Sequence, residues 1–396
     1  MATFRFADPT YFQDGQWDED LALGKEPVLV DPKWEKTILD QLLSGAQLPN
    51  EAGKNGSDSF WIATSGSTGL PKLIQKNRSH IEDEVNYWLS SSDIHFGWDW
   101  KSSRFHVTVP LCHLYGLIWG LFLPRAMGRS IIHSNPLQIK NEDLNENDIL
   151  ITVPYTLKRM YESGMNLPKR IITSGSKFPV PLAQRLRADG IVDIREIYGA
   201  TETGAMGIRN PMWKARYTLL SVVEPKIETN SEIDVLLVKS KFVSKLSLEL
   251  RSKETSQEFV PTSITDSDGY FFTNDAGDLS SEGWNYIGRI DRITKIKGKR
   301  VSLDFIESSI SSIPNVKEVA VISLESKDQE AELACLIVTS KSKEEIQKQL
   351  VDTLPASHIP KKIEITEIIN KLQNGKTDYL SISKYFQLKS LNQIEL

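Results

Sequence analysis

The sequence is poor in cysteine. Among its 396 residues only Cys112 and Cys335 are cysteines, and they form no CxxC pair. A disulfide framework or a structural zinc site is therefore not expected, and both thiols are expected to be reduced, as in a cytoplasmic protein. The six histidines show no HxxxH or other ligand spacing, so the sequence gives no sign of a transition-metal site.

A strong charge of one sign and a long apolar run are also absent. The 47 Lys and Arg residues nearly balance the 52 Asp and Glu residues, and the net charge of −5 gives no general attraction to nucleic acid or anionic lipid. The longest apolar stretch, residues 114–124, is shorter than the roughly 20 residues that span a bilayer. Asp8 and Pro9 interrupt the N-terminal segment, which has no signal-peptide pattern. We expect a cytoplasmic protein with no membrane span and no nucleic-acid partner.

The composition is that of a globular protein, with 40% hydrophobic and 25% charged residues and enough length for two domains. Short apolar runs typical of buried strands alternate with amphipathic helical patterns such as residues 81–89. This alternation predicts an α/β domain with a mostly parallel sheet. The expected strands are residues 60–63, 105–109, 130–133, 148–153 and 170–173, and a further helix is expected over 34–43.

The pattern changes after about Glu232, where hairpin-like strands are expected at 233–238 and 283–288. The C-terminal part reads as a small α+β unit. Its expected elements are helices over 303–313 and 343–354, each followed by a proline, and strands over 316–322 and 331–338. We place the boundary near Asp291, which divides the chain into domains 1–290 and 291–396.

The strongest local signal is Thr64-Ser-Gly-Ser-Thr-Gly-Leu-Pro-Lys72, directly after a predicted strand. Its small residues leave the backbone free to curl, so that successive N–H groups can point at one anion. The hydroxyls and the Lys72 ammonium add donors suited to a polyphosphate. A flexible surface loop is the alternative, and a Walker P-loop is excluded because GxxxxGK[ST] is not satisfied. The predicted phosphate-binding residues are Thr64, Ser65, Gly66, Ser67, Thr68, Gly69 and Lys72.

This loop resembles the signature of the acyl-adenylate-forming superfamily, which includes acyl-CoA synthetases, luciferases and the adenylation domains of nonribosomal peptide synthesis. The family's other motifs follow in order, at Tyr198–Thr203, Asn274–Asp278 with Gly288–Arg300, and Asn374–Lys376. The resemblance spans residues 64 to 376. It implies an α/β fold class, with a large N-terminal α/β domain of layered sheets and a small mobile α+β C-terminal domain.

The resemblance also implies roles in binding ATP and Mg²⁺. Thr201 would contact the α-phosphate, Glu202 would ligate Mg²⁺, and Tyr198 would stack on adenine. Asp278 would accept both ribose hydroxyls, and Arg289 would contact the ribose or the phosphates. Core or solvent-exposed positions are the plainer alternatives for Tyr198 and Glu202. The remaining nucleotide contacts implied are Gly175, Gly199 and Ala200, with Ser176 standing where the family more often shows a second glycine.

Lys376 matches the catalytic lysine, whose charge would stabilise the negative charge that develops at phosphorus. Asp291 falls at the hinge between the domains, and Gly298 on a loop that would approach the pantetheine arm. His113 and Gly116 match the segment that lines the acyl and thiol pocket. A core histidine and an ordinary turn glycine are the alternatives for His113 and Gly298.

The expected function is an AMP-forming acid–thiol ligase of the acyl-CoA synthetase kind. ATP would activate an aromatic or acyl carboxylic acid, as in fatty acid metabolism, and a thiol of coenzyme A or of the phosphopantetheine arm of an acyl carrier protein would take the acyl group. Amino-acid adenylation is disfavoured because residues 114–123 contain no acid to pair with an α-ammonium group. An inactive scaffold is the other alternative. The phosphate loop begins early, at Thr64, which predicts an abbreviated N-terminal region that could require a partner subunit.

Overall fold

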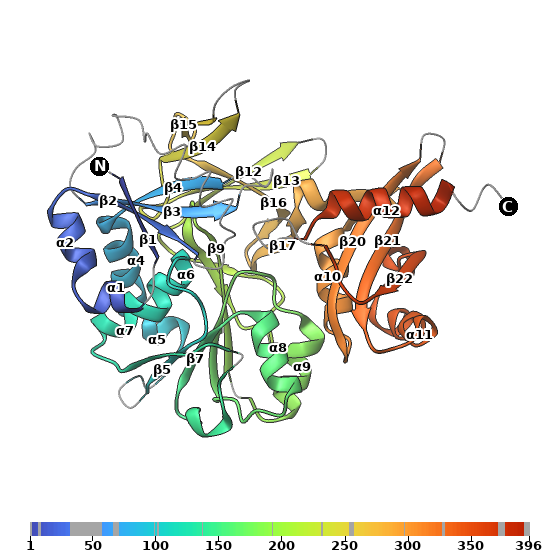
Figure 1. Ribbon diagram of the computed structural model, residues 1–396, viewed down its shortest axis with the longest axis horizontal. Helices are drawn as coiled ribbons and strands as arrows, with labels where there is room; N and C mark the ends of the chain where they lie inside the picture. Colours follow the sequence, from blue (N-terminus) through green and yellow to red (C-terminus); the bar gives the residue numbers. More distant parts are fainter. Residues whose placement is uncertain are drawn as a thin grey trace.

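The computed structural model shows a large α/β part followed by a smaller C-terminal part (Figure 1). The helix expected over 34–43 lies outside the described residues. The structure describes residues 2–6, 9–31, 58–65, 71–98, 100, 103–136, 138–191, 193–230, 233–252, 257–296, 298–326, 329–370 and 377–391.

A seven-stranded sheet forms the centre of the large part, in the order β11-β10-β9-β8-β7-β5-β6. The strands from β6 to β9 are parallel, whereas β10 and β11 are antiparallel. The predicted parallel sheet is thus confirmed at its centre, where β7 is buried along its whole length. The bounds are β5 Phe105–Val107, β6 Ile131–His133, β7 Ile149–Thr152, β8 Arg170–Thr173, β9 Asp193–Ala200, β10 Gly204–Arg209 and β11 Thr218–Leu219.

Helices cover both faces of this sheet because its strands are apolar on both sides. Leu150 and Ile171 pack with α8 and α9 on one face. Ile151 and Ile172 belong to the main core, together with residues of α4, α6 and α7. The helices of this part are α1 Pro9–Gln13, α2 Gln16–Ala22, α4 Arg78–Ser90, α5 Ser92–His95, α6 Leu114–Leu117, the π-helical turn η2 Ile118–Phe122, α7 Leu123–Ala126, η3 Asn141–Asp143, α8 Pro154–Glu162 and α9 Val180–Ala188.

Two further sheets complete the large part. One has six strands in the order β1-β2-β3-β4-β14-β15, and the other has four in the order β12-β13-β16-β17. Their bounds are β1 Ala2–Phe6, β2 Glu26–Val30, β3 Ser59–Ser65, β4 Pro71–Asn77, β12 Glu224–Asn230, β13 Ile233–Lys239, β14 Leu246–Ser252, β15 Gln257–Ser263, β16 Phe271–Ser280 and β17 Gly283–Arg289. The hairpin strands expected after Glu232 are confirmed as β13 and β17.

The C-terminal part has two hydrophobic cores of its own, whose buried residues all lie between Ile296 and Phe386. Helices pack against a three-stranded sheet, β20-β21-β22, as expected for an α+β unit. The elements are η4 Ile290–Arg292, β18 Ile293–Ile296, β19 Lys299–Ser302, α10 Leu303–Ser311, β20 Val316–Ser326, β21 Gln329–Thr339, α11 Lys343–Thr353, η5 Ala356–His358, β22 Lys362–Thr366 and α12 Tyr379–Leu391.

Contacts from α8 and α9 hold the two parts against each other. The buried ammonium of Lys158 donates to the carbonyl oxygens of Ile313 and Val316, at 3.4 and 2.9 Å, and also to that of Ser311. Arg185 donates to the carbonyl of Ser312 at 3.3 Å. A cation beside the carbonyls at and just after the end of α10 is favourable, because the last carbonyls of a helix carry partial negative charge.

Among the described helices, none is long and apolar enough to cross a membrane.

Candidate functional site

The phosphate-loop motif begins at the end of β3 and finishes at the start of β4, and these two strands pair antiparallel. Thr64 pairs with Lys72 and Ser65 with Pro71 in antiparallel register. The Thr64 hydroxyl donates to the carbonyl of Lys72 at 3.2 Å, which fixes the base of the hairpin. The connecting residues Gly66, Ser67, Thr68 and Gly69 lie outside the described residues.

The second motif forms the turn between β9 and β10. Ala200 pairs with Gly204, so Thr201 and Glu202 lie at the tip. The Thr203 hydroxyl accepts from the amide of Ala200 at 3.1 Å and donates to the carbonyl of Gly204 at 2.9 Å. Gly204 has a φ of +67°, and a Cβ there would lie 2.6 Å from Glu84 Oε2 and 2.7 Å from Phe242 Cβ, so the turn favours glycine at this position.

The fold brings these two motifs together. The ammonium of Lys72 lies 4.0 Å from the carboxylate of Glu202, and both side chains remain about one-fifth exposed. Lys72 also lies 3.5 Å from Glu249 of β14. A cation and a hard carboxylate ligand, both open to solvent, form a donor set that suits a phosphate chain with its divalent cation.

A buried lysine outside the predicted site residues also holds this turn in place. Lys76 of β4 is 1% exposed, and its ammonium donates to the carbonyls of Glu202 and Phe242 at 3.3 and 2.8 Å. Burial lowers the pKa of Lys76 to about 8, while the charges of Glu84 and Glu202 oppose that shift. Burial likewise raises the pKa of Glu84, on α4, and the charge of Lys76 opposes it. The sequence of β4, Pro-Lys-Leu-Ile-Gln-Lys-Asn, is largely polar, so no local pattern distinguishes Lys76 as a buried residue.

The third motif contributes a carboxyl group beside Tyr198. The Tyr198 hydroxyl donates to Asp275 at 2.5 Å, and its ring lies 4.9 Å from that of Tyr217 and 5.9 Å from that of Tyr286. Asp275 stands opposite Arg289 in the β16–β17 register. Burial raises the pKa of Asp275 to about 6, against the effects of the Tyr198 hydrogen bond and the Arg289 charge.

Asp278, the predicted ribose ligand, has different neighbours. It pairs with Arg216 at 2.5 Å and accepts from the Asn285 amide at 2.7 Å. The Asn285 hydrogen bond and the Arg216 charge lower the pKa of Asp278. A register shift at Ala276 and Gly277 separates it from Asp275. The structure thus places Asp275, not Asp278, in contact with Tyr198.

A buried ion pair holds the strand that carries Tyr198. The Arg209 guanidinium donates to Glu196 at 2.6 Å, and both side chains are almost fully buried. Glu196 also accepts from the Tyr217 hydroxyl at 2.6 Å and from the amide of Phe178 at 2.8 Å. Because each oxygen of the carboxylate is bonded, the charge of Glu196 is compensated inside the core.

Beside this network, Lys177 donates to the carbonyl of Tyr286 at 2.6 Å, and burial lowers its pKa to about 8. Gly175, two residues earlier, has a φ of +90°, which favours glycine at that position. Gly199 is enclosed by the opposite strand, since a Cβ there would lie 2.3 Å from the carbonyl oxygen of Gly204.

The predicted hinge and thiol positions lie further along the chain. Arg289 is bonded to Asp291 at 3.1 Å, and the Asp291 side chain is half exposed. Gly298 has a φ of +73° and open space around the position of a Cβ. Lys376 lies outside the described residues.

The predicted acyl pocket segment begins at α6. His113 precedes this helix, and its Nε2 lies 3.6 Å from Asp31 Oδ2. Desolvation lowers the pKa of His113, but the neighbouring Asp31 and Cys112 raise it to about 10. Gly116 packs directly against the backbone of Pro110: a Cβ at Gly116 would lie 2.1 Å from the carbonyl oxygen of Pro110. The Tyr115 hydroxyl donates to the carbonyl of Ile172 at 2.8 Å and so joins α6 to the central sheet.

Comparison with known proteins gives matches along most of the chain. The family model described as AMP-binding enzyme matches residues 13–241, and the model of the AMP-binding enzyme C-terminal domain matches residues 306–376. The chain is 29% identical to a 4-coumarate–CoA ligase of Halorhodospira halophila over 41% of this chain and 40% of that protein. It is 24% identical to a 3,4-dihydroxybenzoate–[aryl-carrier protein] ligase of Bacillus anthracis over 79% of this chain and 70% of that protein.

Among solved structures, the chain is similar to the O-succinylbenzoate coenzyme A synthetase (MenE) of Bacillus subtilis in complex with ATP and a magnesium ion. The TM-score is 0.73 at 20% identity, over 95% of this chain and 87% of that chain. At this level of identity the likeness establishes the fold, a large N-terminal domain with a small C-terminal domain. The match to the coumarate ligase spans less than half of that relative's own length.

Proposed function

The chain belongs to the AMP-binding enzyme family of the adenylate-forming superfamily, and from this premise we propose that it is an ATP-dependent acid–thiol ligase. The observation that carries the proposal is the approach of Lys72 to Glu202. These residues belong to two motifs that lie 130 positions apart in the sequence, and they meet where both side chains are exposed to solvent. The Thr203 hydroxyl and the Lys76 ammonium form hydrogen bonds with the backbone of the turn that carries Glu202. Preorganised charges of this kind favour phosphoryl chemistry.

In this proposal Mg·ATP supplies an electrophilic α-phosphorus and pyrophosphate as the leaving group. Lys72, with Thr64, Ser65 and residues 66–69, holds the outer phosphates. Glu202 holds the cation, and Thr201 beside it contacts the α-phosphate. Lys376 neutralises the charge that develops during attack by the carboxylate.

We assign the nucleoside to the aromatic group around Tyr198. Asp275 would accept the ribose hydroxyls in place of Asp278, because Asp275 faces Tyr198 and stands opposite Arg289. The neighbouring backbone at Gly175, Gly199 and Ala200 would contact the base. Tyr198 and Tyr286 provide ring faces beside this carboxyl group.

The substrate we propose is a carboxylic acid, and an aryl acid is the first class to test. The support is that the two relatives described above are named for aryl acids, coumarate and dihydroxybenzoate. Their names also give both possible acceptors, coenzyme A and an aryl carrier protein. His113 and Gly116 would line the path to the acyl carbonyl, with Asp291 and Gly298 serving the domain movement and the thiol arm.

The test is acid-dependent exchange of pyrophosphate into ATP, measured across aryl, short-chain, long-chain and amino acids. Exchange with one group of acids identifies the substrate class. Mass spectrometry of reactions supplied with coenzyme A or a carrier protein then identifies the thiol acceptor. Lys376→Ala should abolish exchange but spare thioester formation from supplied adenylate, whereas Lys384→Ala, an exposed lysine of α12, is the matched control. ATP binding without exchange for any acid would contradict the proposal and favour the inactive scaffold.

A further inference from the structure

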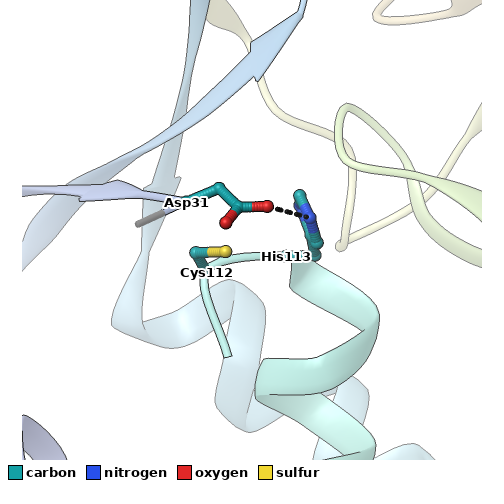
Figure 2. Close-up of side chains that lie close together, drawn as sticks. All are labelled: Asp31, Cys112 and His113. Atoms are coloured by element: carbon teal, nitrogen blue, oxygen red, sulfur yellow. Dashed lines mark ion pairs between the residues drawn. The ribbon is translucent and has the colours of Figure 1, made fainter. Parts of the chain in front are cut away.

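Three side chains of different chemistry converge at the end of β2. Asp31 follows this strand, while Cys112 and His113 form the turn before α6. Figure 2 shows the Asp31 carboxylate pointing at the His113 ring, with the Cys112 sulfur beside them. One ligand atom from each residue lies within 4.8 Å of the other two, and His113 Nε2 lies 3.6 Å from Asp31 Oδ2.

We propose that Asp31, Cys112 and His113 form a binding site for a divalent transition-metal ion such as Zn²⁺. A thiolate sulfur, an imidazole nitrogen and a carboxylate oxygen are the ligand types that Zn²⁺ takes in proteins. Hard ions such as Mg²⁺ prefer oxygen ligands alone, so the sulfur and nitrogen select a softer ion. Within the part of the chain that the structure describes, this is the single place where three such ligands converge.

The exposure of the three residues suits a site loaded from one side. Cys112 is 1% exposed and the Asp31 side chain 14%, whereas the His113 side chain is 48% exposed. The buried sulfur is shielded from water and oxidants, and the ion reaches it past the imidazole. A water molecule on that open side completes four ligands, the number usual for zinc.

Binding of the ion would be coupled to proton release. Ligand thiol and imidazole groups must lose a proton on binding a metal, so three lone pairs would face one cation. The bound ion would tie the end of β2 to the turn before α6, two segments 81 positions apart from Asp31 to Cys112. No sequence spacing reveals such a site, because Asp31 is brought to the others only by the fold.

The test uses the full chain, purified with a chelator and then dialysed against Zn²⁺ or Co²⁺. We expect about one equivalent of Zn²⁺ to remain bound after gel filtration, and a rise in Tm that follows the free Zn²⁺ concentration. Co²⁺ should produce the near-ultraviolet absorption of a sulfur–cobalt bond, with visible bands of tetrahedral coordination. These readouts are independent of ligase activity, so they stand whether or not the proposed function does.

Substitutions assign the signals to individual ligands. Cys112→Ser should remove the sulfur–cobalt band, and Asp31→Asn and His113→Gln should each lower retained Zn²⁺ at least tenfold. Cys335→Ser is the matched control, because Cys335 is also buried but lies in the C-terminal part. It should change neither signal.

Two results would overturn the proposal: a full chain that retains no Zn²⁺ and shows no cobalt spectrum, or a sulfur–cobalt band that survives Cys112→Ser. If Cys112→Ser fails to fold, the Asp31→Asn and His113→Gln variants decide the question alone.

Discussion

The buried ammonium of Lys76 lies 3.3 Å from the main-chain oxygen of Glu202. The strand that leaves the phosphate loop therefore also positions the residue proposed to hold the cation. Lys76 touches neither ATP nor acid in this assignment and acts through the backbone of the turn. The carboxylates of Glu84 and Glu202 stabilise the positive charge of Lys76.

Replacing Lys76 by Met should affect both stability and cation use. Without Lys76 the buried Glu84 carboxyl loses its neighbouring cation. The carbonyl of Phe242 also loses a hydrogen bond, while that of Glu202 keeps the one from the Ser244 amide at 2.8 Å. We therefore expect the free energy of unfolding to fall by about 3 kcal/mol. The Mg²⁺ concentration for half-maximal pyrophosphate exchange should rise several-fold. Urea unfolding and an Mg²⁺ titration measure the two effects. Lys76→Met with Glu84→Gln should recover stability only; recovery of both would reduce Lys76 to a structural residue.

The two aspartates of β16 give a direct comparison. Asp275→Asn should raise the KM for ATP by roughly tenfold or more, since a hydrogen bond to a charged group contributes about 1.5–3 kcal/mol. Asp278→Asn should leave that KM within about twofold because Asp278 faces Arg216 and Asn285. Steady-state kinetics of pyrophosphate exchange decide between them, and the reverse ranking would return the ribose role to Asp278.

Asp275 should also produce a characteristic dependence of stability on pH. Its pKa in the folded protein is about 6, above the usual value of 3.8. The folded state then binds more protons than the unfolded state between pH 4 and 6, so the free energy of unfolding falls as pH rises through this window. The full shift sets an upper limit of about 3 kcal/mol.

The measurement is urea unfolding of the wild type and Asp275→Asn at several pH values. The difference between the two proteins isolates this carboxyl from His80 and His133, whose pKa values burial lowers to about 4. Wild type should lose stability relative to the variant from pH 4 to 6. If the free energies of unfolding of the two proteins change in parallel with pH, the Asp275 carboxyl is not the cause of the pH dependence.

Gly204 provides a test of the turn itself. An alanine there combines a φ of +67° with a Cβ only 2.6 Å from Glu84 Oε2 and 2.7 Å from Phe242 Cβ. Gly128 has nearly the same φ, +64°, but open space, so Gly128→Ala measures the backbone cost alone, about 1 kcal/mol. Gly204→Ala should lose about 3 kcal/mol and most of the exchange activity. Equal losses of stability in both variants would mean that the side chains around Gly204 move to accommodate the added Cβ.

Local pattern was sufficient for much of the fold. The predicted strand 170–173 coincides with β8, and the helix expected at 303–313 corresponds to α10. These elements are set by apolar periodicity and by stop signals such as Pro314, which act over a few residues. The phosphate loop was likewise recognisable because its small residues are consecutive.

Relationships between distant segments could not be read in the same way. The motif resemblance predicts Asp278 as the ribose contact, which stays a prediction, whereas the fold places Asp275 of β16 against Tyr198 of β9. The approach of Asp31 to His113 depends on the fold bringing the end of β2 beside the turn before α6, which no short motif records. Burial and register, which are properties of the completed fold, decided these positions.

The contacts that Lys158 makes with the segment between α10 and β20 imply an energetic preference for one arrangement of the two parts. Any reorientation of the C-terminal part must separate that ammonium from the carbonyl oxygens to which it donates. The depth of this minimum, rather than the flexibility of the connection at Asp291, would then set how often the protein visits a second arrangement. Lys158 is in that sense a determinant of conformer populations, although it lies in neither of the assigned binding sites.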